Sequence, residues 1–391
     1  MPESPLTSRV CSVGSDATAV PTLHTLEVSG DSGIYGCVAH SLASALWRLT
    51  ELRALQLHWE DDHVAVLAEP LRQLTALTRL AICIDTFYCR GAVFVLESTL
   101  TCLSRLADLS LACGCEVTEL GWALGTLTTL TSLDLSYSGV QMDSGDDEEG
   151  VDRCHDAREL ALGLCPLSQL AALTLANTYD GSGGAAALAP ALSQLTALTA
   201  LDLSENYIDA DDAAALAPAL SRLSRLADLN LHSNELGAAG AAALAPSIAL
   251  LTALTRLHLD CNGVGADGAA ALAPALSRLA RLAHLDLASN ALGAAGAAAF
   301  PPPLGGLTAL VALNLRNNNM LYIGDEGLRQ LAPALTRLTR LKQMSLKLGV
   351  HGFCDSTVDA LRAQLPASVW EATDLHADRV RQRKRPRAAA S

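Results

Sequence analysis

Three residue types that together form hydrolase active sites recur at a constant spacing in the middle of this chain. Ser204, His232 and Asp260 follow one another at intervals of 28 residues. A serine nucleophile, a histidine base and an orienting carboxylate are the members of a serine-hydrolase triad. A nucleophile also needs an oxyanion hole and exclusion of water, and a regular exposed sheet provides neither. We therefore expect a polar binding surface here and no catalytic residue.

The same region holds side chains that could bind a metal ion. His232, His258, Asp260 and Cys261 are all residue types that bind zinc. Because they contain no CxxC or HExxH spacing, the sequence favours neither a metal site nor a cofactor. The chain also has no P-loop, no dinucleotide-binding glycine motif after a strand and no kinase motif set. These patterns predict a protein without an active site of its own.

A repeat of 28 residues must position these side chains. Five segments begin one period apart, from LTALTALDLSEN at Leu195 to LTALVALNLRNN at Leu307. Each contains an LxxLxL core whose strand leucines alternate inward, and then an asparagine whose amide can bond the backbone of a tight turn. An alanine- and leucine-rich segment follows and predicts a short helix. The first leucines of the cores are Leu23, Leu52, Leu77, Leu106, Leu130, Leu170, Leu198, Leu226, Leu254, Leu282, Leu310 and Leu341.

Some features of the units depart from a uniform repeat. The asparagine position is irregular in the first six units and is asparagine in the next five, at Asn206, Asn234, Asn262, Asn290 and Asn318. Because proline removes a helical hydrogen bond, we expect short or kinked helices where it recurs, at Pro190, Pro218, Pro246, Pro274 and Pro333. One further step of 28 residues reaches Val369, which would begin a degenerate last unit.

The 28-residue period, the LxxLxLxxN core and the following G-x-x-G-x-x-x-L-x-x-x-L segment resemble the leucine-rich repeat family, specifically its ribonuclease-inhibitor subtype. The resemblance covers roughly residues 23–370. It implies an α/β solenoid, shaped as a horseshoe of about 12–13 repeats, with parallel strands on the concave face and helices on the convex face. Neighbouring units must stack, because no unit buries its leucines alone.

The register of the repeat identifies three rows of side chains on the concave face. Since adjacent strands lie ~4.8 Å apart, the members of a row should be lateral neighbours. Trp59 maps to this face and is a candidate interface anchor, whereas we expect Trp47 and Trp122 in the core or a cap. The first row is Asp134, Thr174, Asp202, Asn230, His258, Asp286 and Asn314; the second is Ser136, Ala176, Ser204, His232, Asp260, Ala288 and Arg316; the third is Tyr137, Asn177, Glu205, Ser233, Cys261, Ser289 and Asn317.

Charge is distributed unevenly along the chain. The net charge is −14, but residues 379–391 hold six cations and no acid, which leaves 21 basic against 41 acidic residues, or −20, in residues 1–378. An acidic body disfavours nucleic acid and anionic membranes and favours a basic protein partner. An extra loop at 141–152 holds six acids. It is best explained as a solvated loop, with contact to a basic partner or weak calcium binding as alternatives.

We expect a disordered lead over residues 1–20, a repeat domain over 21–372 and a basic disordered tail over 373–391. Lys384, Arg385 and Arg387 in the tail resemble a nuclear localisation signal. The alternatives are a nonspecific polyanion-binding tail or one that folds against the acidic body. The first residues do not resemble a signal peptide, and the 11 cysteines form no even framework. These features predict a reducing cytoplasmic location, with nuclear import as an option.

Membrane insertion is the last alternative that the composition raises. The uncharged stretches 181–201 and 291–315 are long enough to span a bilayer, but they follow the repeat and contain turn signals, so we predict no span.

Together these features predict a non-enzymatic scaffold or adaptor that binds a protein partner on an acidic concave face. Arg316, Lys342 and Lys347 make its C-terminal end basic, which would orient the partner. The resemblance also implies alternatives: an activator of a Ran-type small GTPase, whose family has an acidic tail, the sensor part of a NOD-like receptor, or a ribonuclease inhibitor. The candidate contact residues are Trp59, Asp134, Tyr137, Asp202, Glu205, His232, His258, Asp260, Asp286 and Arg316.

Overall fold

A computed structural model describes ten segments of the chain: residues 7–9, 23–28, 36–59, 66–84, 96–113, 120–137, 153–178, 183–318, 324–346 and 355–371. The chain divides into two compact units, Met1–Asn206 and Tyr207–Ser391.

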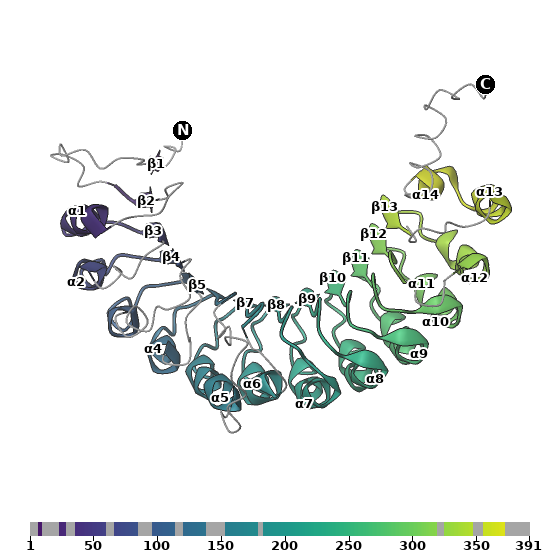
Figure 1. Cartoon of the computed structure of the whole chain (residues 1–391), viewed down its shortest axis with the longest axis horizontal. Coiled ribbons are helices and arrows are strands. Elements are labelled where there is room, and N and C mark those ends of the chain that lie inside the picture. The colour runs from purple at the N-terminus through teal and green to yellow at the C-terminus, as the bar shows by residue number, and fades with distance from the viewer. Residues whose placement is uncertain are drawn as a thin grey trace, which may run out of the picture. The chain divides into compact units, whose positions relative to one another are not determined.

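In the first unit, each described strand is parallel to the next one along the chain. The helices that alternate with these strands lie on the opposite side of the unit from the sheet (Figure 1). The strands are β1 (Thr7–Arg9), β2 (Thr25–Val28), β3 (Ala54–Trp59), β4 (Arg79–Ile84), β5 (Asp108–Cys113), β6 (Ser132–Asp134), β7 (Ala172–Thr174) and β8 (Ala200–Asp202). The helices are α1 (Gly36–Leu46), α2 (Ala68–Arg72), α4 (Gly121–Thr126), α5 (Arg153–Leu164) and α6 (Gly184–Leu192).

The second unit repeats this arrangement with greater regularity. Its strands are parallel, and helices cover the other side (Figure 1). The strands are β9 (Asp228–Asn230), β10 (Arg256–His258), β11 (His284–Asp286), β12 (Ala312–Asn314) and β13 (Gln343–Ser345). The helices are α7 (Ala210–Leu220), α8 (Gly237–Ile248), α9 (Gly265–Leu276), α10 (Gly293–Ala299), α11 (Pro301–Leu304), α12 (Gly324–Leu335), α13 (Asp355–Gln364) and α14 (Ala367–Glu371).

The predicted repeat period is confirmed along the chain. Strands β2 to β13 each begin two residues after one of the twelve core leucines. In a typical unit Leu254, Leu257 and Leu259 are all 0–1% exposed, so the LxxLxL core is buried. Burying one leucine side chain stabilises a fold by about 1.5–3 kcal/mol, which makes these stacked leucines the main source of stability.

Two expectations at the ends of the repeat array were wrong. Residues 7–9, expected in a disordered lead, form β1 and pair with β2. Without β1, the edge of β2 would present unpaired backbone N–H and C=O groups. Val369 does not begin a thirteenth LxxLxL strand, because it lies in helix α14 with 0% exposure. The preceding Pro366 favours a helix start, and its carbonyl accepts the N–H of Trp370.

The prolines of the outer helices lie in the last turn. Pro190, Pro218, Pro246, Pro274 and Pro333 each stand two residues before the end of a helix of 9–12 residues, as expected for short helices. In four of the five helices a hydroxyl three residues later donates to the proline carbonyl at 2.6–2.8 Å. This bond satisfies a carbonyl that the helix end leaves without a partner.

None of the helices in the described part of the chain combines the length and the apolar character that crossing a bilayer requires.

Candidate functional site

The strand face of the second unit consists of the outward side chains of β9–β12 and of the turns that follow these strands. Strand pairing aligns Asn230, His258, Asp286 and Asn314 as direct neighbours. All four side chains are half-buried. In the first unit, pairing likewise aligns Asp134, Thr174 and Asp202. The predicted first row is therefore confirmed within each unit.

The third row lies in a left-handed turn that strand alternation did not predict. All seven of its residues have φ between 49° and 58°: Tyr137, Asn177, Glu205, Ser233, Cys261, Ser289 and Asn317. A non-glycine residue in this conformation costs roughly 1–2 kcal/mol. The turn ends the alternation of side chains between the two faces of the sheet. Tyr137, Glu205 and Cys261 are exposed there.

The acids of the first row have a structural role that the sequence analysis missed. Asp134, Asp202 and Asp286 each accept the backbone N–H two residues later, at 2.9–3.0 Å. Asn230 and Asn314 accept the corresponding N–H at 3.0 and 3.1 Å. The side chain thus supplies the acceptor for a turn N–H. Asparagine can replace aspartate in this role, whereas lysine cannot, because its ammonium group has no acceptor.

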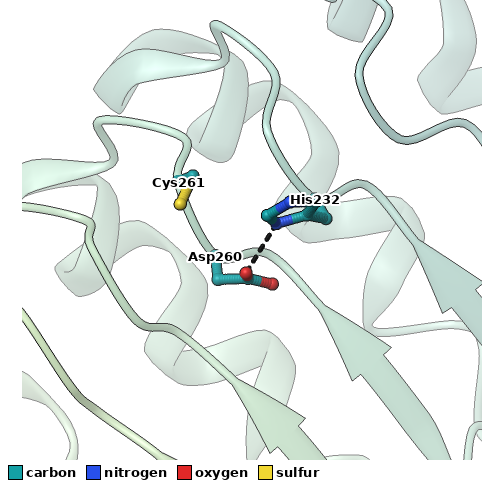
Figure 2. A group of neighbouring side chains, drawn as sticks. All are labelled: His232, Asp260 and Cys261. Carbon is teal, nitrogen blue, oxygen red and sulfur yellow. Dashed lines mark ion pairs between the residues drawn. The ribbon is translucent and has the colours of Figure 1, made fainter. Parts of the chain in front are cut away.

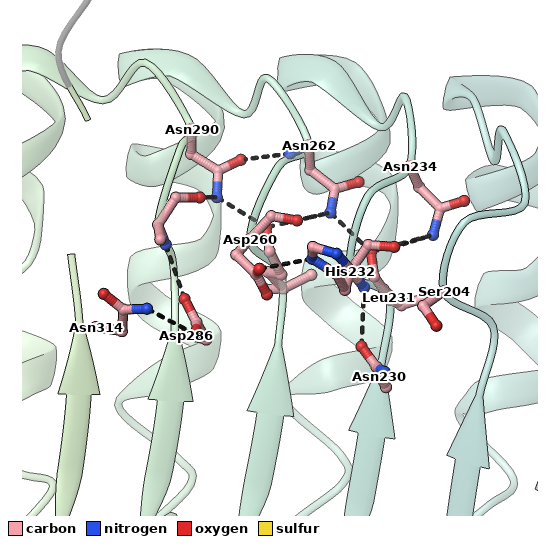
Figure 3. A network of polar contacts seen from close by, with 12 residues as sticks. Ser204, Asn230, Leu231, His232, Asn234, Asp260, Asn262, Asp286, Asn290 and Asn314 are labelled. Carbon is pink, nitrogen blue, oxygen red and sulfur yellow. Dashed lines mark hydrogen bonds and ion pairs between the residues drawn. The ribbon is translucent and has the colours of Figure 1, made fainter. Parts of the chain in front are cut away.

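A ladder of buried asparagines joins successive turns behind the strand face (Figure 3). Asn290 donates from Nδ2 to the Leu259 carbonyl of the preceding repeat at 2.8 Å, and its Oδ1 accepts the N–H of Asn262 at 3.1 Å. Asn206 bonds Leu175 and Thr178 of the first unit in the same way. The predicted role of the repeated asparagine is therefore confirmed.

Histidines and carboxylates meet at the ends of β9, β10 and β11. His232 Nδ1 and Asp260 Oδ2 form an ion pair at 2.6 Å, and their side chains are 37% and 16% exposed (Figure 2). Ligand atoms of His232, Asp260 and Cys261 all lie within 4.8 Å of one another. The same holds for His258, Asp260 and Asp286, so Asp260 belongs to both groups. The set can pair with cationic side chains or coordinate a cation.

The environment of Asp286 penalises its charge. Burial is the main cause that raises the pKa of Asp286 above its ordinary value of 3.8, and the nearby Asp260 carboxylate raises it further. Hydrogen bonds from the Ala288 N–H and the Asn314 amide, together with His258, lower the pKa in part. Asp286 therefore holds its proton to a higher pH in the folded protein than in the unfolded chain.

This shift predicts how the Asp286→Asn variant differs from the wild type. The folded wild type binds more protons than the unfolded chain between pH 3.8 and the raised pKa, so its stability falls as pH rises through that window. Asp286→Asn keeps the turn hydrogen bond, but its stability does not fall in this window because asparagine does not titrate. Urea unfolding from pH 3 to 8 should show the free energy of unfolding of the variant rising relative to that of the wild type through the window. Above the raised pKa the difference between the two proteins should stay constant. Parallel stability curves would contradict the assigned cause.

Ser204, considered from the sequence as the nucleophile of a serine-hydrolase triad, has its hydroxyl bonded within its own unit. His232 and Asp260 are paired, but the Ser204 hydroxyl donates to Asp202 at 2.6 Å and is 5% exposed. A serine hydroxyl has one proton to donate, and here a carboxylate accepts it.

The tryptophans and tyrosines do not all lie where the sequence predicted. Trp122 in α4 is 70% exposed and Trp47 after α1 is 49% exposed, so neither is a core residue. Gly121 is the residue of α4 that faces helix α5. Because successive residues of a helix point in different directions, the following side chain, Trp122, points away from that contact. Tyr137 is 58% exposed, as a contact residue should be. Trp59 is the last residue of β3, but its side chain lies outside the described part.

Sequence analysis missed a row at the starts of the strands. Arg79 on β4 pairs with Asp108 on β5 at 2.7 Å, and Arg256 on β10 pairs with Asp228 on β9 at 2.6 Å. The Asp228 hydrogen bond and charge raise the pKa of Arg256, which keeps that guanidinium charged. All four residues stand two positions before the first-row position on their strands. Side chains two residues apart on a strand share a face, so alternation could have indicated both pairs. Asp108 and Asp228 are thus already neutralised by arginines of the chain.

Of the remaining predicted site residues, some lie in the described part of the chain and others outside it. Arg316 and Lys342 are exposed, as a basic end of the second unit requires. Lys347, the acidic loop at 141–152 and the tail residues Lys384, Arg385 and Arg387 lie outside the described residues. Nuclear import through the tail stays a prediction.

Comparisons with known proteins agree with the repeat units. A family model described as "Leucine Rich repeat" matches residues 194–217, 251–273 and 282–300. No curated protein matches the chain. Among solved structures, an internalin (inlF) from Listeria monocytogenes is 20% identical over 84% of this chain and 82% of that chain, with a TM-score of 0.47.

A second solved structure supports the fold. The TLR13–ssRNA13 complex contains a chain that is 21% identical, with a TM-score of 0.50; the match covers 85% of this chain and 44% of that one. This chain therefore spans less than half the length of that relative. The repeated strand–turn–helix units and the buried leucines therefore form a leucine-rich repeat fold, and the family model matches three segments of it.

Proposed function

We propose that this protein is a non-enzymatic binding module that holds a protein partner against its strand faces. Leucine-rich repeat proteins generally mediate protein–protein interactions. The observation that carries the proposal is the row of charged and hydrogen-bonding side chains in register on the second unit. His258 and Asp286 are aligned by strand pairing, and His232 and Asp260 follow in the next row. Half-buried polar groups on a regular backbone suit specific recognition.

The charge of this face favours basic side chains on the partner. Asp228 is already paired with Arg256, whereas burial raises the pKa of Asp286 and the nearby Asp260 carboxylate raises it further. A cationic group placed between them would relieve that repulsion. The exposed Arg316, two residues beyond β12, adds a positive charge at the other side of the row and would orient the partner.

The test is affinity capture from lysate with variants that remove charge without disturbing the turns. Asp202→Asn probes the first unit and Asp286→Asn probes the second, because an asparagine amide can still accept the turn N–H. Asp267→Asn is the matched control, since Asp267 is exposed in the first turn of α9, on the helical side. We expect a basic protein to be retained several-fold less by at least one strand-face variant, and retention to fall with salt.

Equal retention of every protein by all four proteins would refute binding through the strand faces. A loss confined to Asp267→Asn would move the binding surface to the helices. A Ran-type small GTPase among the proteins lost from the strand-face variants would favour the GTPase-activator alternative. The rate of GTP hydrolysis with and without this protein would then decide it.

A further inference from the structure

We propose that His232, Asp260 and Cys261 form a zinc-binding site at the C-terminal ends of strands β9 and β10. The three side chains supply a nitrogen, an oxygen and a sulfur ligand atom, all within 4.8 Å of one another (Figure 2). Zinc is bound in proteins by these three atom types at about 2.0–2.3 Å. The inference does not depend on the proposed protein-binding function.

The repeat itself brings the ligands together. His232 and Asp260 are one period of 28 residues apart, so stacking of the units places them in the same row. Cys261 is the residue after Asp260, and consecutive strand residues would point to opposite faces. Its left-handed φ of 55° ends the strand pattern and leaves Sγ near the Asp260 carboxylate. No short metal motif is needed, which is why sequence spacing indicated none.

The geometry requires only a small adjustment to accept the ion. His232 Nδ1 and Asp260 Oδ2 are 2.6 Å apart, the separation of two atoms that share a proton. Two ligands bonded to tetrahedral zinc at about 2.1 Å lie roughly 3.4 Å apart. Zinc would therefore replace the shared proton while the two side chains separate by less than about 1 Å. The thiol of Cys261 would lose its proton on binding.

The surrounding backbone holds the ligands in place. The His232 N–H donates to Asn230 Oδ1 at 3.0 Å, and the Asp260 carbonyl accepts the Ser233 N–H at 2.9 Å. The buried Asn262 amide also donates to the Asp260 carbonyl at 3.1 Å (Figure 3). Three protein ligands leave the fourth tetrahedral position for water. Because Cys261 is exposed, the ion can reach the site from solvent.

The neighbouring group of His258, Asp260 and Asp286 is the competing site. It offers one nitrogen and two carboxylates, and oxygen-rich sets favour harder ions than zinc. Both oxygens of Asp286 already accept hydrogen bonds, from the Ala288 N–H and the Asn314 amide. The set with the thiolate therefore fits zinc better. Because Asp260 belongs to both, the two sites are distinguished by the histidines.

The test measures metal binding by the full-length reduced protein after removal of metal with a chelator. Zinc affinity is measured by competition with a chromogenic chelator, and Co²⁺ is used as the spectroscopic probe. The wild type should bind Co²⁺ with tetrahedral d–d bands and a thiolate-to-cobalt charge-transfer band. His232→Ala should weaken zinc binding about 100-fold, and Cys261→Ser should do the same and abolish the charge-transfer band. Far-ultraviolet circular dichroism checks that each variant is folded.

Two controls match these substitutions. His284→Ala removes an exposed histidine of β11 that belongs to neither group, and Cys165→Ser removes another exposed thiol. Both should bind zinc and Co²⁺ as the wild type does. Loss of binding on His258→Ala with none on His232→Ala would overturn the proposal in favour of the competing group. Wild-type affinity in a folded His232→Ala/Cys261→Ser double variant would show that the bound metal lies elsewhere.

Discussion

Replacing Gly163 with alanine should destabilise the first unit by about 3 kcal/mol or more. A Cβ at this position of α5 would lie 2.0 Å from the backbone oxygen of Gly121 in α4, and 2.7 Å from the Gly121 carbonyl carbon and Cα. These are backbone atoms, so no side-chain rotation can relieve the overlap, and the two helices would have to separate. Urea unfolding should show the loss, and amide hydrogen exchange should localise it to α4 and α5.

Gly125→Ala is the matched control in the same helix pair. Its Cβ would meet nothing closer than Pro166 Cγ at 3.5 Å, which is an ordinary contact. Because alanine is favoured over glycine inside a helix by roughly 0.5–1 kcal/mol, this variant should be as stable as the wild type or slightly more stable. Equal stability of Gly163→Ala and Gly125→Ala would show that α4 and α5 do not pack backbone to backbone at Gly121.

Replacing Asn290 with alanine should cost the second unit about 3–5 kcal/mol. The Asn290 side chain is fully buried, and its Oδ1 accepts the N–H groups of Asn262 and Val264 at 3.1 and 3.2 Å. Its Nδ2 donates to the carbonyls of Leu259 and Ala288 at 2.8 and 3.1 Å. Each buried group left without a partner costs about 1–3 kcal/mol. Chemical denaturation of the variant measures the loss directly.

Two further variants separate the contributions of this amide. Asn262→Ala should cost less than Asn290→Ala, because Asn262 Oδ1 is buried without a hydrogen-bond partner and only its donor bonds would be lost. Asn290→Thr should also cost less, since Thr178 occupies the same position in its own unit and donates to the Leu135 carbonyl at 3.1 Å. If Asn290→Ala proved the mildest of the three changes, the ladder would not be a source of stability.

The sequence-based predictions succeeded where the physics is local and periodic. The LxxLxL pattern located twelve strands, and alternation assigned Leu257 and Leu259 to the core and His258 to the strand face. A unit that cannot bury its leucines alone must stack on the next one, so a constant period also determines lateral neighbours. The repeated asparagine was understood in advance because a tight buried turn needs side-chain partners.

The predictions failed where tertiary context competes with the pattern. Val369 continues the period, but it lies in helix α14, which begins directly after Pro366, instead of in a strand. The acids of the first row were interpreted only as binding residues, yet Asp202 and Asp286 also accept turn N–H groups. Trp122 was expected in the core or a cap, but the glycine contact between α4 and α5 leaves it 70% exposed. None of these outcomes follows from composition or spacing.

The sequence by itself determined the repeat, its strands, its buried leucines and the identity of the residues on each row. Only the tertiary structure decided how those residues interact. His232 and Asp260 are 28 residues apart, and their 2.6 Å contact requires that two successive repeats stack. Cys261 joins them because its backbone is left-handed at a position where a strand pattern would turn it away. Periodicity specifies neighbours one period apart, whereas the turn conformation and the contacts between units specify which atoms can share an ion.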